Sequence, residues 1–130
     1  MPPKAKSRHK PPRISEAEWE VMRVAWKKGK ATAQEVVDEL AHKKWSPLTV
    51  KTLLGRLSRK GALSHEPLGK AYVYRPSVRR EDCVRLESES FLDRVFGGAA
   101  APLLAHFVKR AELTREEIDE LRKILAGKKP

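Results

Sequence analysis

The chain has 130 residues, 40% of them hydrophobic, one cysteine and a formal net charge of +11. This size fits one domain, or a small domain with an appendage, and leaves too little core for a large enzyme pocket. No apolar run approaches the ~18 residues of a membrane helix and no apolar stretch follows the N-terminal cations, so we expect neither membrane insertion nor a secretory signal.

The positive charge lies in the first part of the chain. Residues 1–77 carry 17 Lys and Arg against 7 Asp and Glu, a net charge of +10, whereas residues 78–130 carry 11 against 10, a net charge of +1. A cationic part suits a polyanion, and nucleic acid is the commonest one in a cytoplasm. Residues 1–13 mix cations with prolines, which predicts a disordered basic arm. This arm either contacts DNA or is a solubilising tail.

Two helices with matching start signals are predicted after the arm. Ser15 and Glu18 form a capping box at the start of the first helix, and Gly29 ends it. Thr32 and Glu35 form the same motif at the start of the second helix.

The third predicted helix lies in the segment WSPLTVKTLLGRLSRKGAL. Ser46 is its N-cap, Pro47 takes the first helical position and Gly61 closes it. One face carries an apolar stripe, and the opposite face carries hydroxyls and cations, which suits the major groove of DNA. The alternative is a surface helix that happens to be basic. The stripe consists of Val50, Leu53, Leu54 and Leu57, and the opposite face of Thr49, Thr52, Arg56 and Arg59 with Lys51 at its flank.

A β-hairpin is predicted next, with Gly69 and Lys70 at its turn. Three helices and a hairpin in this order are the plan of a winged helix-turn-helix, here residues 14–77, and Lys70 would lie at the tip of the wing. The predicted fold is therefore mainly α: an N-terminal winged helix-turn-helix plus a C-terminal three-helix dimerisation unit. The predicted DNA-binding residues are Ser46, Thr49, Lys51, Thr52, Arg56, Arg59 and Lys70.

Residues 78–130 contain three amphipathic helices, the first two separated by Gly97 and Gly98, and the third capped by Thr114 and Glu117. A unit of this size rarely builds a self-sufficient core. We therefore expect its apolar stripes to meet those of a second chain in a homodimer; the alternative is that they fold back onto the first domain. The predicted dimerisation residues are Phe91, Val95, Leu104, Phe107, Ile118, Leu121 and Leu125.

No pattern for catalysis, a metal or a cofactor is present in the sequence. The four histidines His9, His42, His65 and His106 are scattered without ligand spacing, and no phosphate-binding loop or nucleophile motif occurs. We therefore predict no enzyme, no cofactor and no metal. Cys83 opens a predicted helix, whose dipole would lower its pKa, but a lone cysteine is more often a small buried hydrophobe. A single cysteine also excludes an intrachain disulfide and fits a reducing cytoplasm, where we expect the protein to act.

Three parts of the chain, ISEAEWEVMRVAW, WSPLTVKTLLGRLSRKGAL and FLDRVFGG with ELTREEIDELRKIL, resemble the BlaI/MecI family of transcriptional repressors. The resemblance covers Ile14 to Leu125. It implies a homodimer that binds an inverted-repeat DNA operator and controls β-lactam-resistance or cell-wall genes. Two departures lie on the outward face of the third helix, where Leu48 replaces the usual lysine and Gly55 the usual threonine or asparagine. Thr49, Lys51, Thr52 and Arg56 match the family's DNA-facing positions.

Charge alone would also fit an architectural, nucleoid-type protein that coats DNA without sequence preference. The two hypotheses differ at the third helix, because Thr49 and Thr52 can meet base edges and Arg56 can bind guanine through two hydrogen bonds. A coating protein needs only cations.

Members of the family are commonly released from DNA by a membrane sensor protease that cuts an Asn–Phe bond. The matching bond here joins His106 and Phe107, with histidine in place of the asparagine. These residues are the candidate cleavage site, and induction by another route is the alternative. The cysteine cluster of the copper-responsive branch is missing from this sequence, so we do not expect copper sensing.

Overall fold

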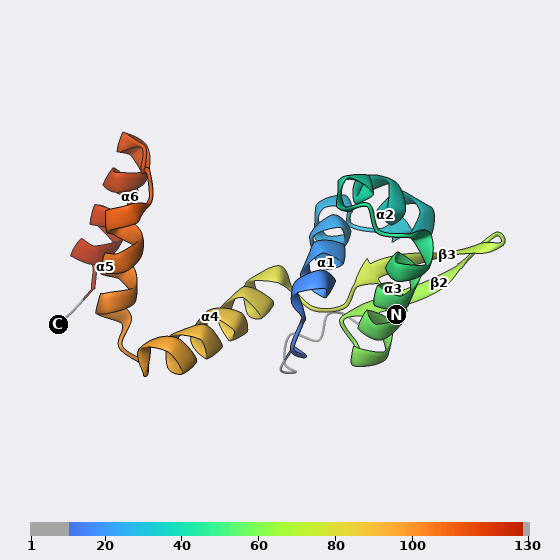
Figure 1. Ribbon diagram of the computed structural model, residues 1–130, viewed down its shortest axis with the longest axis horizontal. Coiled ribbons are helices and arrows are strands. Elements are labelled where there is room, and N and C mark those ends of the chain that lie inside the picture. Colours follow the sequence, from blue (N-terminus) through green and yellow to red (C-terminus); the bar gives the residue numbers. More distant parts are fainter. Residues whose placement is uncertain (1–10, 129–130) are drawn as a thin grey trace. The chain divides into compact units, whose positions relative to one another are not determined.

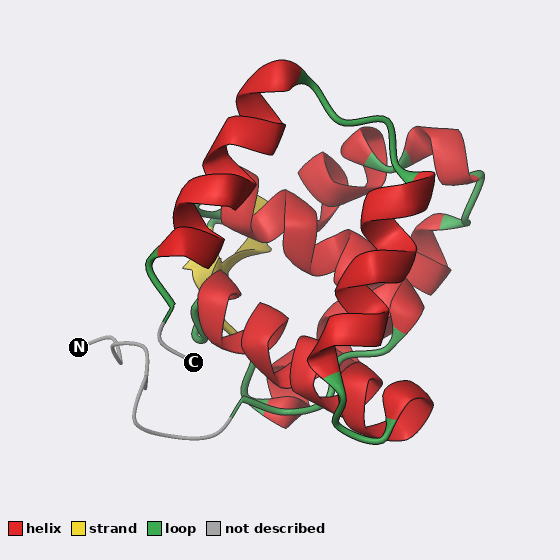
Figure 2. Cartoon of the chain, turned by 90° about the vertical axis from the view of Figure 1, so that its left-hand side faces the viewer, coloured by secondary structure: helices red, strands yellow, loops and turns green. Residues whose placement is uncertain are grey.

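The computed structural model describes residues 11–128, and the predicted basic arm lies outside them except for residues 11–13. Figure 1 shows the elements in chain order, and Figure 2 shows that helices dominate over strands. The described chain divides into two compact units, and the boundary between Ser88 and Glu89 falls within α4. The elements are α1 (Glu16–Lys28), β1 (Ala31–Thr32), α2 (Ala33–Glu39), the 3-10 helix η1 (Ala41–Lys43), α3 (Pro47–Lys60), β2 (Leu63–Leu68), β3 (Ala71–Pro76), α4 (Arg80–Phe96), α5 (Ala100–Arg110) and α6 (Arg115–Ala126).

The predicted capping boxes are present in the structure. At α1, the backbone N–H of Glu18 donates to Ser15 Oγ at 3.2 Å, and the N–H of Ser15 donates to Glu18 Oε1 at 2.8 Å. Gly29 ends α1 with a φ of 83°, a conformation that favours glycine. Thr32 and Glu35 form the same pair of bonds, at 3.2 and 2.8 Å, at the start of α2. Local sequence therefore determines where these two helices begin.

The predicted hairpin is confirmed as β2 and β3, which pair antiparallel from Leu63 opposite Pro76 to Leu68 opposite Ala71. Gly69 has a φ of 64° in the two-residue turn, as such tight hairpins require. The sequence did not predict β1, which pairs antiparallel with β3 and makes a three-stranded sheet of order β1-β3-β2. The hairpin is thereby attached to the segment that enters α2.

One hydrophobic core holds α1, α2, α3 and the base of the sheet together. The apolar stripe predicted for α3 is completely buried in it, beside Val21 and Met22 of α1 and Val36 of α2. Trp26 packs against the core and donates its indole N–H to the carbonyl of Val78 at 3.1 Å. This bond fastens the end of α1 to the chain just before α4. The exposed face of α3 therefore lies over a packed hydrophobic core.

The later helices agree with the predicted pattern. α4 ends before Gly97, Pro102 lies in the first turn of α5, and Thr114 and Glu117 form the capping box of α6. Neither α5 nor α6 contains a buried residue. No helix in residues 11–128 is long and apolar enough to cross a membrane alone; α4 and α5 reach that length and composition only as a pair, which is bent by 98°.

Candidate nucleic-acid interface

The start of α3 is fixed by Ser46. Its hydroxyl accepts the backbone N–H of Thr49 at 3.1 Å, and the two hydroxyl oxygens of Ser46 and Thr49 lie 3.1 Å apart. Pro47 occupies the first turn and Gly61 caps the end with a φ of 86°. The predicted role of Ser46 as a cap is confirmed. The same bonds orient the Thr49 side chain on the helix surface.

The two faces of α3 differ sharply in burial and charge. Val50, Leu53, Leu54 and Leu57 are buried, so the rotation of the helix about its axis is fixed. The side chains on the other face are exposed, and the structure brings the predicted base- and phosphate-contacting residues of α3 onto one surface. These are Thr49, Lys51, Thr52, Arg56 and Arg59.

The cations of this surface are available to a ligand. Within residues 11–128, no ion pair involves Lys51, Arg56, Arg59 or Lys70. In contrast, Arg75 on β3 is paired with Glu66 across the hairpin at 3.1 Å. Cations without a carboxylate partner can neutralise phosphates without first breaking an ion pair.

A groove of about 460 Å³ joins α3 to the wing. Lys51 of α3 and Lys70 of the turn both line it, so the structure brings together two predicted residues that are 19 positions apart. Gln34 and Tyr72 also line the groove and were not predicted. The sequence held one signal for Gln34. It lies in the first turn of α2, which is the first helix of the predicted helix-turn-helix, and that helix crosses the DNA backbone.

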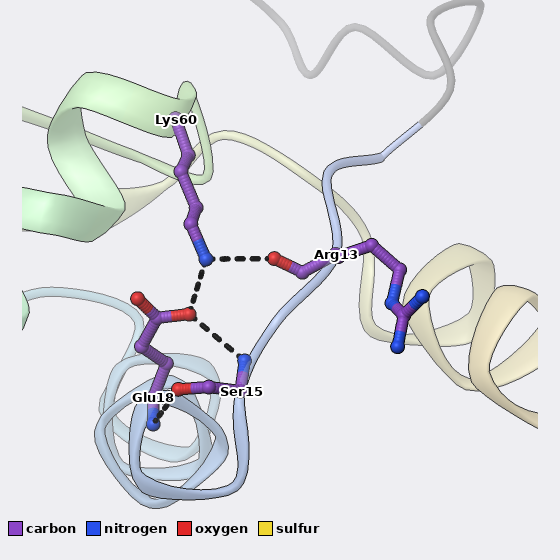
Figure 3. Close-up of polar contacts among 4 residues, drawn as sticks. All are labelled: Arg13, Ser15, Glu18 and Lys60. Atoms are coloured by element: carbon purple, nitrogen blue, oxygen red, sulfur yellow. Dashed lines mark hydrogen bonds and ion pairs between the residues drawn. The ribbon is translucent and has the colours of Figure 1, made fainter.

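Lys60, at the end of α3, has a structural role. Its ammonium group contacts Glu18 Oε1 and donates to the carbonyl oxygen of Arg13 at 2.8 Å (Figure 3). Glu18 is only 2% exposed. Burial raises the pKa of the Glu18 carboxyl, but the hydrogen bonds from Lys60 and the Ser15 N–H outweigh burial, and the pKa lies below its ordinary value. The buried carboxylate is thus charged and paired, and it ties α1 to the C-terminal end of α3.

The second unit, which begins at Glu89, has apolar side chains that are exposed to solvent in the described residues. Val95, Leu104 and Phe107 are each more than half exposed. A pocket of about 510 Å³ lies between α5 and α6, with Val108, Ile118, Leu121 and Leu125 among its lining residues. Of the seven predicted dimerisation residues, only Phe91 is partly buried; the other six are exposed.

The candidate cleavage site lies inside α5. His106 and Phe107 are both exposed, and the carbonyl of Phe107 accepts the N–H of Ala111 at 2.8 Å. The bond between them is therefore part of regular helix. A protease that needs an extended substrate would have to open α5 locally.

Cys83 is buried, and desolvation together with the charge of Asp82 raises the pKa of its thiol to about 11. The interpretation of Cys83 as a small buried hydrophobe is confirmed, and the alternative, a thiol whose pKa is lowered by the helix dipole, is contradicted because burial dominates. Within residues 11–128 no group of three or more His, Cys, Asp or Glu side chains is placed to hold a metal ion.

Comparison with known proteins adds to this geometry. Residues 14–127 match a family model described as penicillinase repressor. The penicillinase repressor of Bacillus licheniformis is 42% identical over 115 residues, which are 88% of this chain and 90% of that protein. The methicillin resistance regulatory protein MecI of Staphylococcus aureus (strain N315) is 38% identical over 116 residues, which are 88% of this chain and 94% of that protein.

A solved structure is also similar. The solution structure of the monomeric form of Bacillus licheniformis BlaI in complex with the blaP half-operator matches with a TM-score of 0.50 and 46% identity. The match covers 56% of this chain and 90% of that chain.

Proposed function

The chain belongs to the penicillinase repressor family, and from this premise we propose how it acts as a sequence-specific, DNA-binding transcriptional repressor. It is not an enzyme, because the family is one of repressors. In our proposal residues 14–77 are the DNA-binding domain and residues 78–130 the dimerisation domain. Two chains would bind an inverted-repeat operator in the cytoplasm and block transcription of β-lactam-resistance or cell-wall genes.

The observation that carries the DNA-binding proposal is the division of α3 into a buried apolar face and an exposed face of hydroxyls and unpaired cations. Thr49 and Thr52 are short donors and acceptors for base edges, and Arg56 can bind guanine O6 and N7 together. Lys51 and Lys70 line one groove and would hold a phosphate strand between α3 and the wing. The hydroxyls of Thr49 and Thr52 and the guanidinium of Arg56 would supply a sequence preference that a purely cationic coating protein lacks.

Dimerisation is supported by the exposed apolar side chains of α5 and α6. Burying them against an identical surface would remove apolar area from water at about 25 cal/mol per Å². A dimer also binds two half-sites as one unit, so the second half-site is met at high effective concentration. Loss of the dimer would therefore weaken operator binding without any change in α3.

For release from DNA, a membrane sensor protease acting at the bond between His106 and Phe107 is the route that the family likeness suggests. A cut there would separate the DNA-binding domain from α6 and so weaken the dimer. Two features favour a different route: the asparagine before the cut bond is replaced, and the bond lies within α5. We therefore propose that induction does not depend on this cut.

A gel shift with the DNA upstream of the protein's own gene tests the proposed function. The full chain should retain a discrete complex in the presence of excess unrelated DNA at a stated salt concentration. Equal competition by unrelated DNA would favour the architectural alternative and contradict a sequence-specific repressor.

A further inference from the structure

Leu48 is the most exposed large hydrophobic residue of the proposed DNA-binding domain, residues 14–77, with 72% of its surface accessible to solvent. It lies in the first turn of α3. At about 100° per residue, Leu48 points away from the buried stripe of Val50, Leu53, Leu54 and Leu57 and lies at the centre of the outward face. The N-terminal residues of a recognition helix are those that contact base edges.

A single exposed leucine is ordinary on a protein surface, so its surroundings decide what it means. Thr52 lies one turn further along the same face, and Lys51 and Arg56 flank it without ion pairs in residues 11–128. These unpaired cations would repel the same face of a second copy of the chain. They attract a polyanion, so duplex DNA is the occupant that the charge favours.

Gly55 supplies a second, independent observation on the same face. Glycine inside a helix is unfavourable relative to alanine, and the backbone of Gly55 does not take the positive φ that would require it. A Cβ built at this position would meet only the end of the Arg59 side chain, with Nη1 at 3.5 Å. Nothing in residues 11–128 therefore requires a glycine at this position, whereas a ligand that approaches the helix closely would.

From these observations we propose that Leu48 reads thymine in the major groove by packing against its C5-methyl group, with Gly55 allowing α3 to approach the base edges. Apolar contact with the thymine methyl is a recognised form of base readout, and no other base of unmodified DNA carries a methyl group there. This inference rests on the proposed function and names a specificity-determining residue within it.

The test begins with selection of a binding site from random duplexes by the full chain. Each thymine of the selected site is then replaced in turn by deoxyuridine, which removes the methyl group and keeps base pairing. We expect one thymine in each half-site at which the replacement weakens wild-type binding roughly four-fold, the equivalent of one buried methyl group.

Variants assign that effect to Leu48. Leu48→Ala should bind the thymine and deoxyuridine sites equally, while the matched control Leu68→Ala, which removes an exposed leucine from β2, should keep the difference. Leu48→Lys should also lose the difference and should steepen the salt dependence by about one phosphate contact. Thermal unfolding of each variant verifies that the exposed substitutions leave the fold intact.

A selected site at which no deoxyuridine replacement matters, or one whose methyl dependence survives in Leu48→Ala, would overturn the inference and leave the repressor function standing. Failure of the wild-type chain to enrich any sequence would instead overturn the proposed function, and the role of Leu48 with it.

Discussion

Replacing Lys60 with methionine should destabilise the protein, because it removes the cation that pairs with a buried carboxylate. Methionine keeps most of the aliphatic stem, so the change isolates the charge. The Glu18 carboxylate would retain only the N–H of Ser15 as a hydrogen-bond donor. Removing one partner of a buried ion pair costs about 3–5 kcal/mol, and since the Lys60 side chain is 34% exposed, we expect a smaller loss of about 2–3 kcal/mol in the free energy of unfolding.

The loss should depend on pH with a defined sign. In the wild type the pKa of Glu18 is lowered from its ordinary value of 4.5, so its contribution to stability is present above pH 4.5 and is lost as the pH falls through the lower, folded-state pKa. In Lys60→Met, burial without the cation raises the pKa of Glu18. Lowering the pH therefore neutralises the buried carboxylate and reduces the loss of stability in the variant. The stability difference between the two proteins should therefore be largest at neutral pH, should begin to narrow as the pH falls through the raised pKa of Glu18 in the variant, and should narrow further below pH 4.5, where the wild type loses its own contribution.

Urea unfolding at neutral pH and at pH 4 measures both effects. All proteins are compared at one concentration, because the proposed dimer would couple stability to concentration. Combining Lys60→Met with Glu18→Gln removes the uncompensated charge and should restore part of the lost stability. Our account of this cluster would be refuted if Lys60→Met cost less than ~0.5 kcal/mol, or if the double variant were no more stable than Lys60→Met alone.

Four further outcomes are expected. Arg56→Ala should weaken operator binding by ~1–3 kcal/mol and relax base preference at one position per half-site, whereas equal weakening on unrelated DNA would make Arg56 a phosphate contact. Leu121→Glu should yield monomers in sedimentation and lose operator affinity, and a wild-type monomer at micromolar concentration would contradict the dimer. Gly55→Ala should raise stability by ~0.5–1 kcal/mol, seen as a higher Tm, yet weaken operator binding; unchanged binding would show that DNA does not approach this position closely. In cells challenged with a β-lactam, a Western blot should show intact repressor, and a fragment ending at His106 would instead establish cleavage before Phe107.

The features that sequence predicted correctly are those that a few neighbouring residues determine. The capping boxes at Ser15 and Thr32, the proline and glycine that bound α3, and the Gly69 turn are each specified within four or five positions. Their hydrogen bonds form inside the same segment, so the pattern of residue types carries enough information to place the element.

The features that sequence missed depend on partners far along the chain. Strand β1 is only two residues long, which is too short to show the alternation of apolar and polar residues that marks a strand in a sequence. It exists because Ala31 and Thr32 pair with Tyr74 and Val73 of β3. Lys60 and Glu18 are 42 residues apart, and nothing near either one indicates that the lysine is engaged and unavailable to DNA. The groove that joins Lys51, Lys70 and Gln34 likewise exists only after the sheet and helices have packed.

Thr32 belongs both to the sheet and to the start of α2, and this double role affects DNA binding. Its backbone belongs to the strand that pairs with Val73 of the wing, while its side chain and N–H form the capping box of α2. The residue that caps α2 is therefore also the residue through which β1 pairs with the wing strand β3. The side chains of α2, α3 and the wing that would contact a DNA groove and the neighbouring phosphates are thus positioned before binding. Little of their conformational entropy is then lost when the complex forms. Substituting Thr32 would remove the side-chain half of the cap and loosen the start of α2, beside the groove that Thr32 lines together with Lys51 and Lys70.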